Sequence, residues 1–294
     1  MNEKTDFNCP ICDSKDLAEK YKDTLGDDLP TFDYNFSPDS EKHYRIVSCR
    51  NCSHCFATPR HKDLYVNYNS DQIDKTYINL GSQRVATDRK VVKILLKYLK
   101  NGNLLDIGCA TGDFLVTASK YYKTEGLELS AWASKIAQNR GLKVHKCLIH
   151  DVPNKDFNDM ITLWGVIEHF EFPKQEVINM RSLLKKNGLV CLWTGDISSI
   201  TAKLMGERWH YCHGQHIQLF TKRSLRHLFL NNGFEEVKIT TYPYVMTMHS
   251  LANTLTRYPT ISKIINPIIA SKLFLNSKIT ISLPGEMFAI FKKT

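Results

Sequence analysis

The stretch that decides the fold is Leu104-Leu105-Asp106-Ile107-Gly108-Cys109-Ala110-Thr111-Gly112-Asp113-Phe114. Apolar residues lead to an aspartate, small residues follow, and a helical pattern begins near Phe114. Small side chains let a bound molecule approach the backbone closely, and Gly112 suits the turn that opens a helix. The glycine spacing is Gly-x-x-x-Gly rather than Gly-x-Gly-x-x-Gly, so the dinucleotide-binding fingerprint is absent.

On both sides of this turn, short apolar stretches alternate with stretches of helical period. The expected helices cover 82–99, 114–121, 131–139 and 176–185, and the expected strands cover 103–107, 123–129, 142–146, 160–166, 189–194, 236–241 and 287–292. Such alternation predicts an α/β fold whose parallel sheet is covered by helices on both faces. Sheets of this kind bind ligands beyond the carboxyl ends of their strands, near the topological switch point.

The second expected strand leads to Glu128, 22 residues after Asp106. That separation is the reach of one strand–helix–strand step. An acidic side chain in this place can accept hydrogen bonds from both hydroxyls of a ribose. The two segments together therefore predict a site for a nucleoside-bearing ligand.

With segment 159–169, which reads Asp-Met-Ile-Thr-Leu-Trp-Gly-Val-Ile-Glu-His, these motifs resemble the class I S-adenosylmethionine-dependent methyltransferases over roughly residues 80–245. The resemblance implies a Rossmann-like seven-stranded methyltransferase sheet and S-adenosylmethionine as cofactor. Loop 108–112 would hold the methionine end of the cofactor and Glu128 its ribose. At Ala110 the family usually has glycine. The cofactor-binding residues so implied are Asp106, Gly108, Ala110, Gly112, Glu128, Leu129, Leu148 and Trp164.

Within that set, Asp106 would orient the loop and the cofactor's amino group, directly or through water. Leu129, Leu148 and Trp164 would line the adenine and sulfonium region. Core packing is the alternative reading for Leu148 and Trp164.

Candidate bases should follow the fourth and fifth strands, because methyl transfer is an in-line displacement in which the protein aligns the nucleophile and sometimes takes its proton. Two groups qualify, Glu168-His169 and the histidine-rich segment 209–216. A metal site within 209–216 is disfavoured, because no carboxylate lies at a convincing spacing and Cys212 is its sole cysteine.

Residues 215–234 resemble the corresponding region of bacterial methyltransferases that act on sugars and other small molecules. The resemblance implies His216 as base or substrate hydrogen-bonding group, with His169 as the second candidate. A histidine has the right pKa for proton transfer near neutral pH. Sugar C-methyltransferases tend to have Glu-His here, whereas Gln215 cannot take a proton. The alternative for each histidine is a helix cap or a bond to a backbone carbonyl.

The amino-terminal region contains Cys9-Pro-Ile-Cys12 and Cys49-Arg-Asn-Cys52. Each turn can direct two thiolates at one ion, so the four cysteines predict a zinc-ribbon-like site that is closed and structural. The 36-residue gap between the turns is long for such a site. His54 or Cys55 could replace a ligand, and free buried thiols are the alternative.

Composition restricts the class of protein. The chain has 294 residues, 43% of them hydrophobic and 23% charged, which excludes a disordered, collagen-like or coiled-coil protein. Residues 1–42 carry 5 basic and 11 acidic side chains, whereas residues 43–294 carry 34 and 19. An acidic head on a basic body permits an anionic partner.

The sequence also bears on location. The opening residues show no apolar signal-peptide core, and the uncharged stretch 239–256, interrupted by Pro243, is too polar to span a membrane. Nine cysteines without an export signal point to a reducing cytoplasm.

We expect a zinc-ribbon-like domain at 1–62, a linker with helices at 63–100, and an S-adenosylmethionine-binding domain at 101–245. The remainder, 246–294, would hold a helical insertion and the final strand of the sheet. Pro259 and Pro267 divide segment 246–283 into short helices that would form a lid; a homodimer surface and a weak membrane contact are the alternatives.

The leading functional hypothesis is methyl transfer to a small or carrier-linked acceptor, such as a nucleotide-activated sugar or a polysaccharide precursor. An RNA methyltransferase is the first alternative. The acidic cysteine module argues against nucleic acid, as does the lack of an Asn-Pro-Pro-Tyr-type motif or of interleaved aromatic and basic residues. The second alternative is a catalytically inactive cofactor-binding scaffold, for which Ala110 and Gln215 are the only support.

Overall fold

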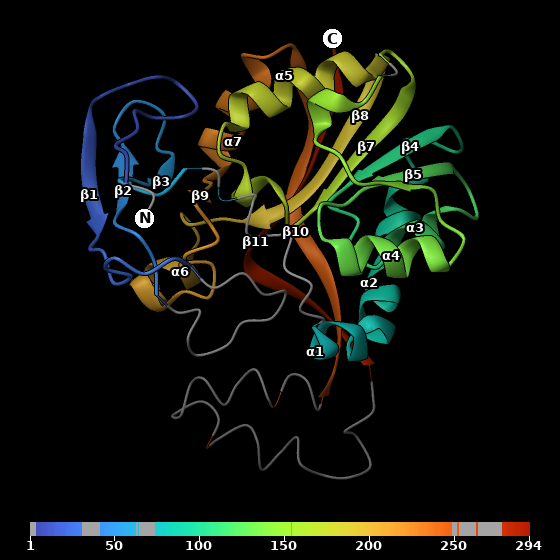
Figure 1. The fold of residues 1–294 in the computed structure, drawn as a ribbon, viewed down its shortest axis with the longest axis horizontal. Coiled ribbons are helices and arrows are strands. Elements are labelled where there is room, and N and C mark those ends of the chain that lie inside the picture. The colour runs from blue at the N-terminus through green and yellow to red at the C-terminus, as the bar shows by residue number, and fades with distance from the viewer. Residues whose placement is uncertain are drawn as a thin grey trace.

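The structure is a computed structural model that describes residues 4–30, 42–62, 64, 74–153, 155–248, 252, 263 and 278–294. The described residues form two sheets. One has seven strands in the order β10-β11-β8-β7-β4-β5-β6, and the other has four in the order β1-β2-β3-β9 (Figure 1).

The large sheet has the expected α/β architecture. Its parallel pairs are β4–β5, β5–β6, β4–β7 and β7–β8, and β11 lies antiparallel between β8 and β10. The strands are β4 (Asn103–Ile107), β5 (Lys123–Leu127), β6 (Val144–His145), β7 (Asn158–Trp164), β8 (Leu184–Gly195), β10 (Phe234–Thr247) and β11 (Lys278–Lys293). Since the chain runs outward from β4 in both directions, the switch point lies at the carboxyl end of β4.

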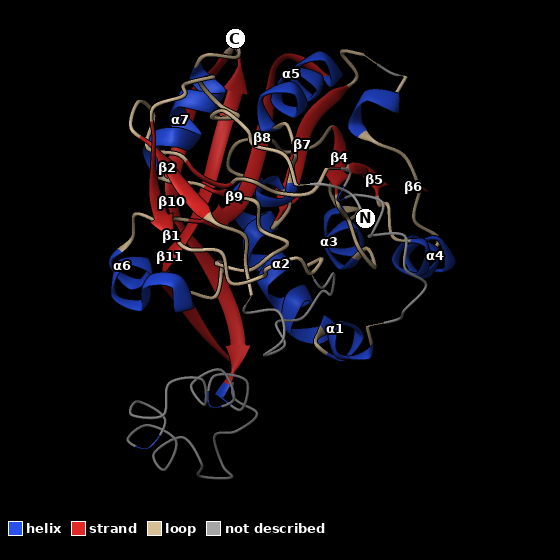
Figure 2. Ribbon diagram, turned by 60° about the vertical axis from the view of Figure 1, so that its left-hand side comes forward, coloured by secondary structure: helices blue, strands red, loops and turns tan. Residues whose placement is uncertain are grey.

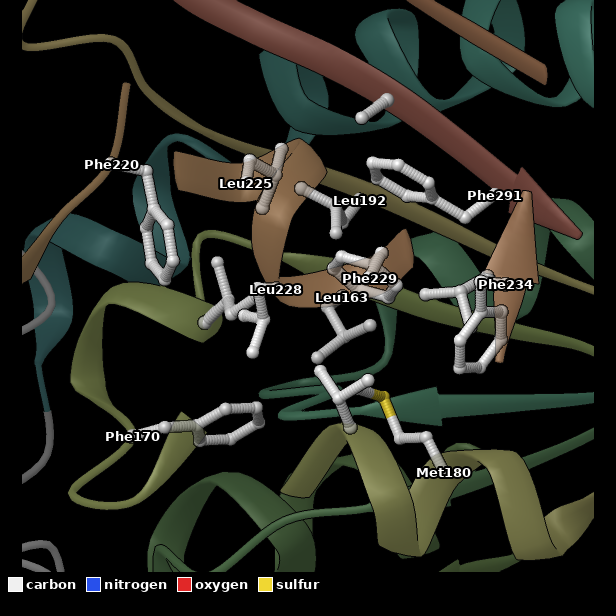
Figure 3. Close-up of a cluster of buried hydrophobic side chains, with 14 of the residues drawn as sticks. Leu163, Phe170, Met180, Leu192, Phe220, Leu225, Leu228, Phe229, Phe234 and Phe291 are labelled. Atoms are coloured by element: carbon white, nitrogen blue, oxygen red, sulfur yellow. The ribbon is translucent and has the colours of Figure 1, made fainter. Parts of the chain in front are cut away.

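Helices cover both faces of this sheet (Figures 1 and 2). One face carries α2 (Gly81–Leu95), α3 (Asp113–Ala118) and α4 (Ala131–Asn139), and the other carries α5 (Pro173–Leu183) and α7 (Lys222–Leu230). Side chains alternate along each strand, so on β8 Cys191 packs on the α2–α3 side and Leu192 on the α5–α7 side. Figure 3 shows the apolar core on the α5–α7 side, where the rings of Phe229 and Phe291 stack with their centroids 4.1 Å apart.

The small sheet contains three short amino-terminal strands and one strand from far along the chain. They are β1 (Leu17–Tyr21), β2 (Ile46–Cys49), β3 (Cys55–Ala57) and β9 (Gln218–Leu219), and all are antiparallel. β9 follows the histidine-rich segment that the sequence assigned to the methyltransferase domain. The amino-terminal module is therefore completed by a strand from the larger domain.

Parts of the expected lid are strand rather than helix. In β10 and β11, Val245 pairs with Thr280, Met246 with Ile279 and Thr247 with Lys278. The expectation of helices was wrong at both ends of 246–283, because these apolar and β-branched residues extend an antiparallel hairpin. Most of the remainder, including Pro259 and Pro267, lies outside the described residues.

Short elements complete the described chain. They are the helices α1 (Lys75–Asn79) and α6 (Ile200–Met205), and the 3-10 turns η3 (Ile149–Asp151), η4 (Ile167–His169) and η5 (Gly206–Arg208). Within the described ranges, no helix has the length and apolar character needed to cross a bilayer.

Candidate functional site

The loop between β4 and α3 has the backbone that the sequence predicted. Gly108 and Gly112 have φ of +69° and +81°, in the left-handed region that favours glycine. A Cβ on Gly108 would lie 2.6 Å from Cγ2 of Val166, and one on Gly112 would clash with Leu142. Ala110 also has a positive φ, +47°, so the backbone there has the conformation for which glycine is the usual residue.

Glu128 holds this loop in place. One of its carboxylate oxygens accepts a hydrogen bond from the backbone N–H of Ala110 at 2.8 Å, and the other accepts one from Ser130 at 2.7 Å. The side chain is buried at the carboxyl end of β5. A carboxylate has about four acceptor positions, so it can accept more hydrogen bonds than these two.

The other predicted cofactor residues surround the same end of the sheet. Asp106 is buried and accepts a hydrogen bond from Oγ1 of Thr162 at 2.6 Å, and burial raises its pKa well above the usual value. Leu129 and Leu148 are half-buried. The ring of Trp164 packs against Phe114 at 4.9 Å, which supports the core-packing reading, although its buried Nε1 has no hydrogen-bond partner.

The structure brings together the two candidate bases that lie 47 positions apart in the sequence. The ring centroids of His169 and His216 are 4.7 Å apart. His169 lies in η4, which begins directly after Val166, the residue that packs on Gly108. The histidine pair is therefore connected to the cofactor loop by a short, packed segment.

Backbone carbonyls orient both rings. Nδ1 of His169 lies 3.1 Å from the carbonyl oxygen of Gln215, and Nδ1 of His216 lies 3.1 Å from that of Tyr211. Because a carbonyl can only accept, each Nδ1 carries a proton. Burial lowers the pKa of His169 to about 4 and that of His216 well below its usual value. His216 is thus a neutral imidazole at pH 7, with the lone pair on Nε2. The expectation from the sequence of a histidine pKa near neutral pH was wrong for both rings, because burial disfavours the charged imidazolium.

Glu168 joins the histidines, so that one potential ligand atom of each of the three residues lies within 4.8 Å of the others. Its carboxyl accepts a hydrogen bond from Oγ1 of Thr194 at 2.9 Å, and burial raises its pKa to about 8. Sequence spacing within 209–216 could not place this carboxylate beside His216, because it comes from a different strand end. His213 also contacts the group, its ring 3.6 Å from that of His216.

The four predicted zinc ligands come together as expected. Sγ of Cys9 lies 3.5 Å from Sγ of Cys52, and Sγ of Cys12 lies 3.5 Å from Sγ of Cys49. In a tetrahedral site with Zn–S bonds of about 2.3 Å, sulfur atoms are about 3.8 Å apart, so the cluster fits a closed structural zinc site. His54 and Cys55, the suggested replacements, are not in this cluster.

The two cysteine turns have the same backbone geometry. The first cysteine of each donates its N–H to the carbonyl five residues on, from Cys9 to Ser14 and from Cys49 to His54, at 3.0 and 2.8 Å. The residue after each Cys-x-x-Cys motif, Asp13 or Ser53, has φ of 61°. A zinc ribbon requires two such turns that direct their four thiolates at the same metal position.

The cysteine module contacts the segments that carry the histidine pair. Nε2 of His54 lies 2.8 Å from Oε1 of Gln218 in β9, and the amide nitrogen of Gln218 donates to the carbonyl of Phe170 at 2.8 Å. A guanidinium nitrogen of Arg60 donates to the carbonyl of Glu171 at 3.0 Å. No sequence pattern indicates the contacts of the module with these segments, since they join residues more than 100 positions apart.

A cavity of about 520 Å³ lies at the opposite edge of the large sheet. Its lining includes Leu99, Asp159, Lys186 and Lys292, which lie near the amino ends of the parallel strands. Ligands of such sheets bind at the carboxyl ends, so this cavity is separate from the cofactor loop.

Comparison with known proteins agrees with this geometry. A family model described as "Methyltransferase domain" matches residues 82–239, more than half of the chain. The chain belongs to this methyltransferase family. It is thus an S-adenosylmethionine-dependent methyltransferase of the class I fold, as the motifs around Asp106 and Glu128 predicted.

Solved structures share the fold at low identity. An S-adenosylmethionine-dependent methyltransferase from Archaeoglobus fulgidus is 18% identical with a TM-score of 0.52, over 75% of this chain and all of that one. A second, from Thermotoga maritima, is 21% identical with a TM-score of 0.50, over 74% of this chain and 93% of that one.

Among curated proteins, one from Methanocaldococcus jannaschii, "Uncharacterized protein MJ1123", is 30% identical over 118 residues, which is 40% of this chain and 56% of the relative. The chain spans about half the length of the curated relatives it matches.

Proposed function

We propose that this methyltransferase acts on a small or carrier-linked acceptor, a nucleotide-activated sugar or a related polysaccharide precursor, in a reducing cytoplasm. When bound, the cofactor supplies a methyl group activated on a sulfonium. Gly108, Gly112 and Glu128 would hold it at the carboxyl end of β4. The remaining task for the protein is to orient an acceptor and, for a hydroxyl, to take its proton.

We assign that task to His216, with His169 beside it. The observation that supports this assignment is the pair of imidazoles, 4.7 Å apart, in which His216 is buried and His169 lies on η4, which begins directly after the Val166 that packs on Gly108. The Tyr211 carbonyl holds the proton of His216 on Nδ1, so Nε2 is the atom that would accept a proton. Gln215, buried beside it, would hydrogen-bond rather than deprotonate.

A small acceptor also agrees with the surroundings of the pair. His213, Gln215 and His216 are buried, and the cysteine module contacts β9, which directly follows the segment that contains them. A compact acceptor carried on an anionic nucleotide could contact the basic body of the protein.

The test measures S-adenosylhomocysteine release with a panel of nucleoside-diphosphate sugars. His216→Asn should lower turnover by about 10²- to 10⁴-fold, the usual contribution of a general base, and should leave cofactor affinity unchanged by calorimetry. The exposed His145, which pairs with Glu125 at 3.0 Å, gives the matched control His145→Asn and should keep full activity.

Three results would contradict the proposal. The first is a wild-type rate in His216→Asn with the true acceptor. The second is turnover of RNA alone, with strong salt dependence. The third is turnover that requires an added divalent cation and is lost with a chelator, because His216 would then be a metal ligand instead of a base.

A further inference from the structure

Helix α2 carries an acidic residue on its buried face. The buried positions of this helix are Thr87, Asp88, Val91, Val92 and Leu95. Asp88 is only 8% exposed, and its buried Oδ2 has no hydrogen-bond partner among the residues that the structure describes. Carboxylates are almost never fully buried unless they are paired, so this position needs an explanation that packing does not give.

The basic residue nearest in sequence does not neutralise Asp88. Nε of Arg84, one turn earlier on α2, donates to Oδ2 of Asp113 at 3.0 Å, and its guanidinium stacks over Tyr77 at 3.6 Å. Burial and the negative charge of Asp113 raise the pKa of Asp88 to about 8, and the positive charge of Arg84 opposes this shift only in part. Without a ligand, Asp88 is thus held as a neutral acid or as an uncompensated charge.

Asp88 lies over the face of the sheet to which Asp106 and Trp164, two of the predicted cofactor-binding residues, also point. Residues of α2 pack with Leu104 on β4, Met160 on β7 and Tyr242 on β10 in one core. Because side chains alternate along a strand, Asp106 on β4 and Trp164 on β7 point to this side too. Asp106, Tyr242 and Tyr244 are all influenced by the charge of Asp88.

A second buried polar atom lies against the same tyrosine. The ring of Trp164 is 6.3 Å from that of Tyr242, and the Nε1 donor of Trp164 is buried without a partner. Among the described residues, an acceptor (Oδ2 of Asp88) and a donor (Nε1 of Trp164) thus lack partners on the same face of the sheet, and Tyr242 is influenced by the charge of the first and lies near the ring of the second. A zwitterionic amino-acid group offers one cation and one anion to such a pair.

We propose that Asp88 binds the α-ammonium of the cofactor's methionine end, an inference that rests on the cofactor of the family and not on the acceptor. Asp106 is less suited to this contact, since Oδ1 already accepts from Thr162 at 2.6 Å. The ammonium supplies the direct charged partner that Arg84, paired with Asp113, does not supply, and it converts a buried neutral acid into a charge-assisted hydrogen bond.

The experiment compares two ligands that share the adenosine moiety. S-Adenosylhomocysteine carries the α-ammonium, whereas 5′-methylthioadenosine lacks the amino-acid group. In calorimetric titrations, Asp88→Asn should weaken S-adenosylhomocysteine about tenfold or more, the value of one hydrogen bond to a charged group. Its affinity for 5′-methylthioadenosine should not change.

One control variant should weaken both ligands, and a second should weaken neither. Glu128→Gln should weaken both ligands, because the ribose is common to them. Glu125 lies on β5, and its carboxylate pairs with Lys143 at 2.6 Å. Glu125→Gln should weaken the binding of neither ligand. Asp88→Asn preserves shape and removes a buried acid, so we expect its melting temperature to match or exceed that of the wild type.

The inference would be overturned if Asp88→Asn bound S-adenosylhomocysteine like the wild type, or if it lost both ligands equally. If Asp88→Asn fails to fold, the wild type still decides: a deaminated analogue of S-adenosylhomocysteine should bind about tenfold more weakly than the parent, and equal affinity contradicts the contact. Failure of the acceptor assignment would leave these affinities untouched and would show only in turnover.

Discussion

The two sheets of this protein are stabilised in different ways. The seven-stranded sheet is covered by helices on both faces, and each face has its own buried apolar cluster. The strands of the four-stranded sheet are 2 to 5 residues long. Cys9, Cys49 and Cys52 of its module belong to the same cluster as Phe170 and Phe220 of the larger domain. A small sheet of this kind needs a metal and a neighbour to be stable.

The difference shows how the second region serves the first. The larger domain holds the cofactor loop by itself, through Glu128 and the packed glycines. The histidine pair lies instead on η4 and on the segment before β9, where His54 and Arg60 of the module make hydrogen bonds. We infer that loss of the module should disturb the acceptor end more than the cofactor end.

The largest effect is expected from removal of the zinc ligand Cys49. Cys49→Ser leaves three thiolates, and structural zinc contributes about 10–16 kcal/mol of apparent binding energy to folding in small zinc domains. The purified wild type should contain one zinc per chain, and the variant should lose it. Hydrogen exchange should show unfolding of β1 to β3, whereas calorimetry should show nearly unchanged cofactor binding.

A matched control is Cys147→Ser, which replaces a half-buried cysteine of the larger domain outside the cluster. It should keep both zinc and stability. A metal-free Cys9→Ser/Cys49→Ser protein that is fully folded and active would contradict the role of the metal.

Gly112→Ala should destabilise the cofactor loop next most. The residue has φ of +81°, and a new Cβ would clash with the side chain of Leu142. Backbone strain and overpacking each cost about 1–3 kcal/mol. Urea unfolding measures the sum. Gly141→Ala, with φ of +78° but open space around the new Cβ, should show the strain alone, and equal losses in both variants would refute the packing argument.

The buried Glu168 predicts a pH dependence. Its pKa is raised to about 8 by burial, so the folded state keeps a proton that the unfolded state loses above about pH 4.3. Stability should therefore fall as pH rises from about 5 to 8, by at most about 1.4 kcal/mol per pH unit for this one group. Glu168→Gln should flatten this part of the curve in urea titrations at several pH values.

Glu125→Gln serves as the opposite case. The bonds from Lys143 and His145 outweigh partial burial and lower the pKa of Glu125, so this carboxylate stabilises the protein above its ordinary pKa. Its removal should not reduce the slope between pH 5 and 8. Identical slopes for Glu168→Gln and the wild type would exclude Glu168 as the source.

The smallest effect is expected for Ala110→Gly. Glycine relieves the left-handed strain at φ of +47°. It also increases the conformational entropy of the unfolded chain, which lowers the free energy of unfolding by about 0.4–1 kcal/mol. These two terms oppose each other, so unfolding free energy and cofactor affinity should both stay close to wild type. A large loss of either would show that the methyl group of Ala110 makes a contact that the loop geometry does not reveal.

Much of the fold could be predicted because local patterns specify it. The strands around Asp106 and Glu128 follow from apolar runs, and the glycine turn follows from residues that tolerate positive φ. The pairing of four cysteines follows from the repeated Cys-x-x-Cys unit. Each of these features is marked by short local motifs, and the cysteine site is indicated by two such motifs even though 36 residues separate them.

The features that could not be predicted depend on contacts between distant segments. Nothing local marks 218–219 as a strand of the amino-terminal sheet, and Met246 and Ile279 became strand because they pair with each other. Glu168 meets His216 only after folding. Asp88 can be noticed in the sequence, because its spacing places it on the same helix face as Val91, Val92 and Leu95. The same spacing is also typical of a polar residue at the border of an apolar face, so the sequence alone does not predict burial.

The most direct test of the cofactor site is calorimetric titration of S-adenosylmethionine into the wild type and Glu128→Ala, with the fold checked by circular dichroism. We predict binding to the wild type and an affinity about tenfold or more weaker in the variant, because the carboxylate anchors Ala110 and, in this assignment, would receive the ribose. Equal affinity in a folded variant, or no binding to the wild type, would contradict the assignment of the cofactor to the carboxyl ends of β4 and β5.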